Sequence, residues 1–327
     1  MSLPANLLRN LILAVIASIA FYGIWVLIAG PDQVWEEVKR LGWLGWFIIL
    51  GLSLFNYLLR FGRWQLYLQR LGYHVPAWPN FRFYLAGFAF TATPGKVGEV
   101  VRSLYLKRYN VKYTDSIAAF FVERLVDVVA MVLLSLLAAY VFEEWRWLIA
   151  IVSALLILLL PLLRSPWLFE MIRRFQGHLS SAKLLTMIGH LLSLLESSSV
   201  LLRSGSLYAG LGLGVLAWAA EGMALYVVVQ LLGIDISAPL AVGIYGVSIL
   251  VGALSFVPAG LGSTEVVMGA LLILVGLAEP VAVSAVLICR VATLWFAVAI
   301  GLIAALELEL GHAGRFAMVN AKQGDIS

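Results

Sequence analysis

The sequence predicts an all-α polytopic membrane protein with six transmembrane helices and two re-entrant helical hairpins, arranged as an inverted-topology repeat. Hydrophobic residues make up 62% of the chain and charged residues 12%, against about 45–50% and about 25% in soluble domains. Mean hydropathy is +0.99. Several apolar stretches approach or exceed the roughly 20 residues that a helix needs to cross a bilayer. A motif that occurs once in each half predicts the repeat.

Six apolar segments are long enough to be membrane spans. They cover residues 11–29, 41–59, 117–142, 147–163, 207–232 and 281–306. The first lacks the small-residue cleavage site of a signal peptide, so we expect a retained signal anchor. Two further segments, 81–99 and 239–277, are interrupted by proline and glycine. Interrupted helices in matching positions of two halves are typical of transporter binding sites.

Basic residues gather on one side of the expected topology. The loops 60–82, 102–112 and 164–206 carry most of them, whereas the opposite loops are acidic. The positive-inside rule therefore predicts that both termini are cytoplasmic and that the protein lies in the inner (cytoplasmic) membrane. Segment 81–99 then enters and leaves on the cytoplasmic side, and segment 239–277 on the outer side. Because each segment returns to the side from which it enters, both are predicted to be re-entrant. Protein or a water-filled cavity must then satisfy their non-helical backbone at membrane depth.

The chain is expected to divide into two halves. Residues 1–145 form the first inverted repeat, residues 146–310 the second, and residues 311–327 a cytoplasmic tail. The 164–206 segment of the second half combines basic residues with apolar residues at helical spacing. It is predicted to be an amphipathic helix on the inner leaflet, with an ordinary cytoplasmic connector as the alternative.

A motif of proline, glycine and glutamate occurs once in each half. The first copy, PGKVGE at residues 94–99, is followed by an apolar stretch that ends at Arg124. The second copy, PAGLGSTE at residues 258–265, is followed by one that ends at Arg290. In both copies 25 positions separate the last glutamate of the motif from this arginine. A membrane unit duplicated in opposite orientations places the binding site between its copies.

Charged side chains inside the expected spans carry the candidate chemistry, because inserting each one costs about 2.5–3.5 kcal/mol. We expect a polar chamber in which Arg124 and Arg290, from opposite halves, bind one anionic group through their planar guanidinium groups. The other substrate-binding candidates lie at the hairpin tips: Lys96, Gly95, Gly98, Gly260 and Gly262. The candidates for proton coupling or gating are Glu99, Glu123, Asp127, Glu221 and Glu265.

The same charges also have a purely structural interpretation. Each arginine could pair with a nearby carboxylate, and such buried pairs can fix helix register without any transport. The possible partners are Glu123 and Asp127 for Arg124, and Glu221 and Glu265 for Arg290.

Cofactor chemistry is not expected. The single cysteine, Cys289, excludes an intrachain disulfide and a thiolate metal site, and the four histidines show no ligand spacing. No phosphate-binding G-x-x-x-x-G-K-[ST] loop is present, so ATP is not expected to drive the protein directly. The net charge of +4 comes without a basic tail or RNA-binding motif, and no nucleic-acid partner is expected.

At these motifs the chain resembles the lysylphosphatidylglycerol synthetase transmembrane-region family, also described as flippase-like or uncharacterised inner-membrane proteins. The resemblance rests on residues 94–102, 123–127 and 258–265 and extends from about residue 10 to 310. In fused members, this region is associated with moving aminoacylated phosphatidylglycerol between leaflets, and a separate cytosolic domain makes that lipid. Other members are thought to handle lipid or polyprenyl-linked glycan intermediates. No synthetase domain is visible in this chain, so no enzyme is expected.

The expected function is therefore that of a membrane lipid translocase. It would move a phospholipid or polyprenyl-phosphate-linked head group between leaflets, coupled to protons or by passive equilibration, and that lipid would be its partner. Two alternatives are a secondary transporter of a small anion and an accessory subunit of a lipid-modifying enzyme or glycosyltransferase.

Overall fold

The computed structural model describes residues 20–91 (apart from 21, 28 and 29), 101–139, 147, 151, 154, 165–177, 182–255 and 257–324. The regular elements in these ranges are helical, and none is a strand. The helices are α2 Pro31–Arg40, α3 Gly42–Arg70, α4 Ala77–Phe88, α5 Val101–Leu106, α6 Tyr113–Ala139, α8 Pro166–Gly177, α9 Ala182–Leu201, α10 Ser204–Leu231, α11 Ala238–Leu254, α12 Ser263–Leu274, α13 Glu279–Arg290 and α14 Phe296–Gly324.

Three of these helical stretches are long and apolar enough to cross a membrane: Gly42–Arg70, Gly205–Leu231 and Glu279–Leu310. They contain the predicted spans 41–59, 207–232 and 281–306 almost completely. Helix α6 matches the predicted span 117–142 and carries three charged residues near one another close to its middle, Glu123, Arg124 and Asp127. Most of the predicted spans 11–29 and 147–163 lies outside the described residues. Large side chains such as Trp43 (80% exposed) cover the outside of the bundle, as expected for a surface that faces lipid.

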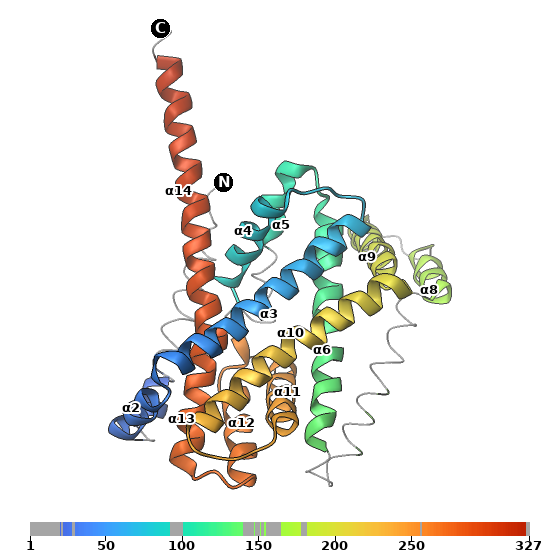
Figure 1. Ribbon diagram of the computed structural model, residues 1–327. Coiled ribbons are helices and arrows are strands. Elements are labelled where there is room, and N and C mark those ends of the chain that lie inside the picture. Colours follow the sequence, from blue (N-terminus) through green and yellow to red (C-terminus); the bar gives the residue numbers. More distant parts are fainter. Residues whose placement is uncertain are drawn as a thin grey trace.

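Equivalent helices of the two halves run in opposite directions (Figure 1). Helices α3 and α10 pack side by side along most of their length and are antiparallel. Helix α6 begins at the upper end of the view and descends, whereas α13 begins at the lower end and continues upward into α14. The first residues of α6 and α13, at positions 113 and 279, are 166 positions apart, the same offset as the two sequence motifs.

The ends of α3 and α10 are built identically. Gly72 and Gly233 both follow the helix with positive φ, 89° and 85°, a backbone conformation that glycine adopts without strain. The next residues, Tyr73 and Ile234, donate to the carbonyls of Leu68 and Val229. This is the αL glycine ending that satisfies the last carbonyls of a helix. After each of these endings, the chain turns back into the first helix of a hairpin, α4 or α11.

Each half contributes one helical hairpin. Helices α4 and α5 form the first, and α11 and α12 the second. In Figure 1 the first lies in the upper half of the bundle and the second in the lower half. Helix α4 packs on α14, the long helix of the other half, and α11 packs on α6 in the equivalent way. The two hairpins therefore lie toward opposite ends of the bundle.

Glycines let these crossings close. A Cβ on Gly243 of α11 would lie 2.3 Å from the backbone nitrogen of Ala138, and one on Gly301 of α14 would lie 2.2 Å from that of Ala89.

We expect Gly243→Leu and Gly301→Leu each to lower the free energy of unfolding by about 1–3 kcal/mol or more, because backbone cannot move aside as a side chain can. Thermal unfolding in detergent measures this. Gly212→Leu, at an exposed α10 position with open space around its Cβ, is the control. Equal melting of all three variants would contradict these crossings.

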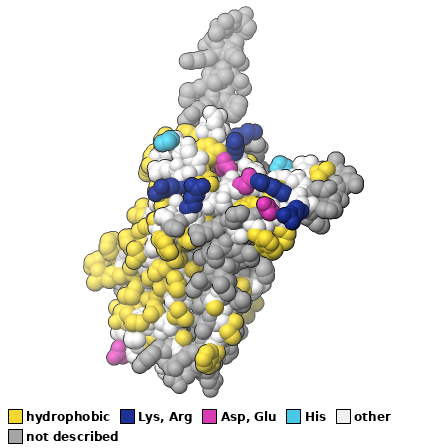
Figure 2. All heavy atoms as spheres, turned by 90° about the vertical axis from the view of Figure 1, so that its right-hand side faces the viewer, with side chains coloured by type: hydrophobic (Ala, Val, Ile, Leu, Met, Phe, Trp, Pro, Cys, Tyr) yellow, Lys and Arg dark blue, Asp and Glu magenta, His cyan; other side chains and the backbone are white. Residues whose placement is uncertain are grey.

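The 164–206 segment differs from the expectation of one surface helix. It contains α8 and α9, and the apolar face of α9 packs on α6, where Ile188, Leu192 and Leu195 are buried. Helix α8 exposes Trp167 and Met171. On the face seen in Figure 2, charged side chains form a band above a mainly hydrophobic surface. Such a division is typical of a boundary between lipid and water.

Helix α3 is longer than the predicted span 41–59, and this corrects the sequence interpretation of two arginines. Arg60 and Arg63 were assigned to a cytoplasmic loop, but both lie within α3 and are buried. Arg102 was also counted as a loop charge and is 1% exposed. These three guanidinium groups belong to the interior of the bundle, because carboxylates of α6 lie beside them.

Candidate functional site

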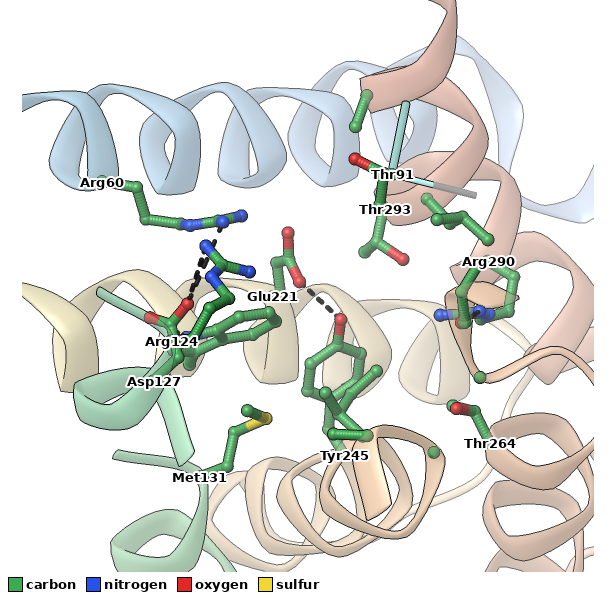
Figure 3. A pocket seen from close by; sticks show the side chains of 18 of the residues that line it. Arg60, Thr91, Arg124, Asp127, Met131, Glu221, Tyr245, Thr264, Arg290 and Thr293 are labelled. Carbon is green, nitrogen blue, oxygen red and sulfur yellow. Dashed lines mark hydrogen bonds and ion pairs between the residues drawn. The ribbon is translucent and has the colours of Figure 1, made fainter. Parts of the chain in front are cut away.

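A pocket of about 280 Å³ lies in the middle of the bundle, between the two hairpins. Helices α3, α6 and α10, the end of α4, the tip of the α11–α12 hairpin and the α13–α14 junction all contribute to its walls. Most of the wall is apolar or aromatic, with a few charged groups at separate places (Figure 3). A concave, largely apolar site with a small number of convergent polar groups is the usual form of a ligand-binding pocket.

One end of the pocket is cationic. The guanidinium groups of Arg60 and Arg124 lie close together there, beside Asp127 (Figure 3). A terminal nitrogen of Arg124 is 3.1 Å from Oδ2 of Asp127, and one of Arg60 is 4.0 Å from the same oxygen. The Arg60 guanidinium also lies 5.3 Å from the ring centre of Trp218. Two guanidinium groups on one wall suit a doubly charged or bidentate oxyanion such as phosphate.

Behind this end lies a buried ion-pair cluster in which Asp127 lines the pocket, whereas Glu123, Arg63 and Arg102 do not. Glu123 accepts a hydrogen bond from Tyr84 at 2.7 Å and pairs with Arg102, whose guanidinium stacks 3.7 Å from the ring centre of Trp64. Arg63 donates to Oδ1 of Asp127 at 2.6 Å. Glu123, Arg63 and Arg102 are almost completely buried. Removing any one of them would therefore leave the opposite charge of its partner buried without that pairing. Their geometry fits the structural interpretation.

Glu221 lies between the two ends of the pocket. It belongs to α10, is 4% exposed, and accepts a hydrogen bond from the Tyr245 hydroxyl at 2.5 Å. Both residues line the pocket. Figure 3 shows Arg60 and Arg124 on one side of this pair and Arg290 on the other. A carboxylate exposed to the pocket interior can accept a proton or bind a donor on a ligand.

The far end of the pocket is formed by Arg290. Its Nε donates to Glu265 at 2.7 Å, and its Nη2 donates to the backbone carbonyl of Ala259 at 2.9 Å. The Tyr22 hydroxyl donates to the same Glu265 carboxylate at 2.5 Å. Ala259 has φ 54°, a strained value for a residue with a Cβ. Arg290 thus holds the tip of the second hairpin in place while one face of its side chain lines the pocket.

Two glycines of the second motif have backbone roles at this tip. Gly260 lines the pocket at φ 66°, and a Cβ there would lie 2.5 Å from Oγ1 of Thr264 and 3.0 Å from Cα of Gly252. Gly262 precedes α12 at φ 83°. Packing and turn geometry therefore account for both glycines, and Gly262 is not among the described residues that line the pocket.

A π-helical turn, Val291–Trp295, directly follows Arg290. Such turns widen a helix by one residue and are frequent at functional sites. Here the turn brings Thr293 and Leu294 to the pocket wall, and the Thr293 carbonyl accepts a hydrogen bond from Tyr57 of α3 at 2.9 Å. The first and second halves of the chain are thereby joined at the pocket.

The structure brings together part of the predicted site. Arg124, Arg290, Asp127, Glu221 and Gly260 line the pocket. Glu123 and Glu265 are buried behind the arginines. The remaining candidates, Lys96, Gly95, Gly98 and Glu99, lie outside the described residues. Both arginines share one pocket, at opposite ends, and both also make carboxylate pairs of the kind that the structural interpretation expects.

Several pocket residues were not singled out from the sequence. They are Arg60, Thr91, Trp218, Tyr245 and Thr293. Arg60 had a detectable signal, since the apolar residues Trp64, Tyr67 and Leu68 continue the helical pattern beyond it. In the described part of the chain, no group of three or more His, Cys, Asp or Glu residues could hold a metal ion.

The fold and the pocket define the class: a helical membrane protein with a largely apolar pocket that carries a few charged groups between its helices. The sequence model for the lysylphosphatidylglycerol synthase TM region matches residues 11–301, and the chain belongs to this family. A relative in Methanothermobacter thermautotrophicus, described as a UPF0104 membrane protein, is 28% identical over 302 residues, which cover 86% of this chain and 87% of the relative.

Proposed function

We propose that this protein is a lipid translocase that moves the phosphate-bearing head group of a phospholipid or polyprenyl phosphate across the membrane. The observation that carries this proposal is the pocket at the meeting point of two oppositely directed hairpins, with arginines at both ends and apolar walls. Charged groups at membrane depth are costly and usually mark a ligand or ion pathway. Family membership supports a lipid-related role.

The proposed topology follows the same logic. The protein would have six spans and two re-entrant hairpins in an inverted repeat, with both termini in the cytoplasm of an inner membrane. The antiparallel pairs α3/α10 and α6/α13–α14 support it. Alternating exposure of a fixed site is then achieved when one half moves against the other. No catalytic role is proposed for the protein, and the lipid is its proposed partner.

Reconstitution tests the function directly. The purified protein is placed in vesicles with labelled phosphatidylglycerol, its lysyl derivative or a polyprenyl phosphate, and the transfer of each label between leaflets is measured with and without a pH gradient. The proposal expects one lipid class to move faster than in protein-free vesicles. If none does and a small soluble anion is taken up instead, the protein is an anion transporter.

Glu221 is the proposed proton-coupling residue, because it is a pocket carboxylate between the two arginine ends. We expect Glu221→Gln to lose the acceleration caused by a pH gradient and to keep gradient-independent translocation, since glutamine fills the same space without titrating. Tyr245→Phe removes the hydrogen bond to Glu221 but leaves the carboxylate, so it should keep a gradient response. A full gradient response in Glu221→Gln would assign coupling to another group.

A further inference from the structure

The pocket is not equally enclosed on all sides. Most residues that line it are almost fully buried, including Tyr57, Glu221 and Tyr245. The strongly exposed lining residues are Ala253 and Val257, at the end of α11 and just beyond it. Because these two exposed wall residues lie close together in the chain, the described part of the pocket opens beside them.

The opening lies between α6 and α11. These helices are in close contact at Gly243 and Ala138, and again at Gly246 and Met131. This order of contacts makes the two helices antiparallel. Further along, Arg124 and Val128 of α6 and Ile249 and Ala253 of α11 line the pocket. The opening therefore lies toward the ends of these two helices that carry Arg124 and Ala253.

The rim of this opening is apolar. It is formed by Val128 of α6, by Ile249 and Ala253 of α11, and by Val257; we call these four residues the portal. The outward-facing neighbours Val251 and Leu254 are 37% and 58% exposed, so the surface around the portal is also hydrophobic. Arg124, with a side chain 19% exposed, stands next to the portal on the inner side.

We propose that the portal is a lateral exit to the membrane, through which the hydrocarbon chain of a bound lipid extends while its phosphate lies at Arg60 and Arg124. This rests on the proposed function and specifies how the substrate is seated. An apolar rim keeps a hydrocarbon chain out of water, as the bilayer does. A small soluble anion would have no use for an apolar opening beside its binding groups.

Photocrosslinking of the intact protein in vesicles tests the portal. The probe is phosphatidylglycerol with a photoreactive group on its acyl chain near the glycerol, and the labelled residues are mapped by mass spectrometry. We expect labelling at Ala253 and Val257 that excess unlabelled phosphatidylglycerol reduces by about tenfold or more, as for a saturable site. Leu254, which is adjacent to Ala253 and more exposed than Val257, is the internal control. Its labelling should fall only as far as the unlabelled lipid dilutes the probe in the bilayer.

A second arm removes the phosphate from the probe. A photoreactive hydrocarbon without a head group should label Ala253, Val257 and Leu254 without competition, because nothing anchors it at the arginines. Equal, non-competable labelling of all three residues by the phosphatidylglycerol probe would overturn the portal. If such labelling is found but translocation is normal, the portal is wrong and the proposed function still stands. If portal labelling is competable but no lipid is translocated, the protein binds lipid there and the proposed function is wrong.

Discussion

Replacing Glu123 by alanine is expected to lower the free energy of unfolding by about 3–5 kcal/mol, the usual cost of breaking a buried ion pair from one side. Glu123 is fully buried and lies within ion-pair distance of Arg63 and Arg102, which are also buried. Its loss would leave guanidinium groups packed together without this carboxylate. Chemical or thermal unfolding in detergent measures the effect.

Glu196→Ala is the matched control for this prediction. Glu196 pairs with Arg173 at 2.7 Å, but the two side chains are 52% and 60% exposed, so the pair should contribute only about 0–1 kcal/mol. A double change of Glu123 and Arg102 to methionine should recover part of the stability, because it removes both charges. Equal unfolding of Glu123→Ala and Glu196→Ala would show that the buried cluster does not stabilise the fold.

Arg60→Gln and Arg124→Gln are expected to reduce lipid translocation by about 10- to 100-fold each, with a smaller loss of stability than Glu123→Ala, because Arg63 and Arg102 still pair with Asp127 and Glu123. A hydrogen bond to a charged group contributes about 1.5–3 kcal/mol, which corresponds to this range of affinity. Both arginines line the pocket next to the proposed phosphate position. The vesicle assay measures the rate, and thermal unfolding checks the fold.

The conservative change Arg124→Lys separates charge from geometry at this position. Lysine keeps the positive charge but cannot present two parallel donors, so its translocation rate should fall between those of wild type and Arg124→Gln. Arg82→Gln is the control, because Arg82 pairs with Glu307 on the partly exposed surface of α4 and α14. Wild-type translocation rates in both Arg60→Gln and Arg124→Gln would show that the phosphate does not bind at this end of the pocket.

The sequence allowed the main helices and the interrupted hairpins to be predicted because these depend on local signals. Apolar run length places α3 and α10, and proline and glycine interrupt the segment that becomes α11 and α12. The shared offset of 166 positions appears again in the starts of α6 and α13. Such signals need no knowledge of which helices are neighbours.

The contacts of the site could not be predicted in the same way. Arg60 and Arg63 were assigned to a loop because a span defined by hydropathy ends at its first charges, whereas their burial depends on carboxylates of α6. The hydrogen bond between Tyr22 and Glu265 joins residues 243 positions apart, and no local sequence pattern predicts it. The spacing of Glu123, Arg124 and Asp127 identified the right helix turn but not which of these side chains faces the pocket.

An experimental structure of the protein in lipid nanodiscs, determined with the lipid that it translocates, would locate the bound lipid directly. We expect density for a phosphate within hydrogen-bonding distance of Arg60 and Arg124, continuous with a hydrocarbon chain that leaves between α6 and α11 over Val128 and Ala253. An empty pocket, with lipid density only around the outside of the bundle, would contradict this expectation.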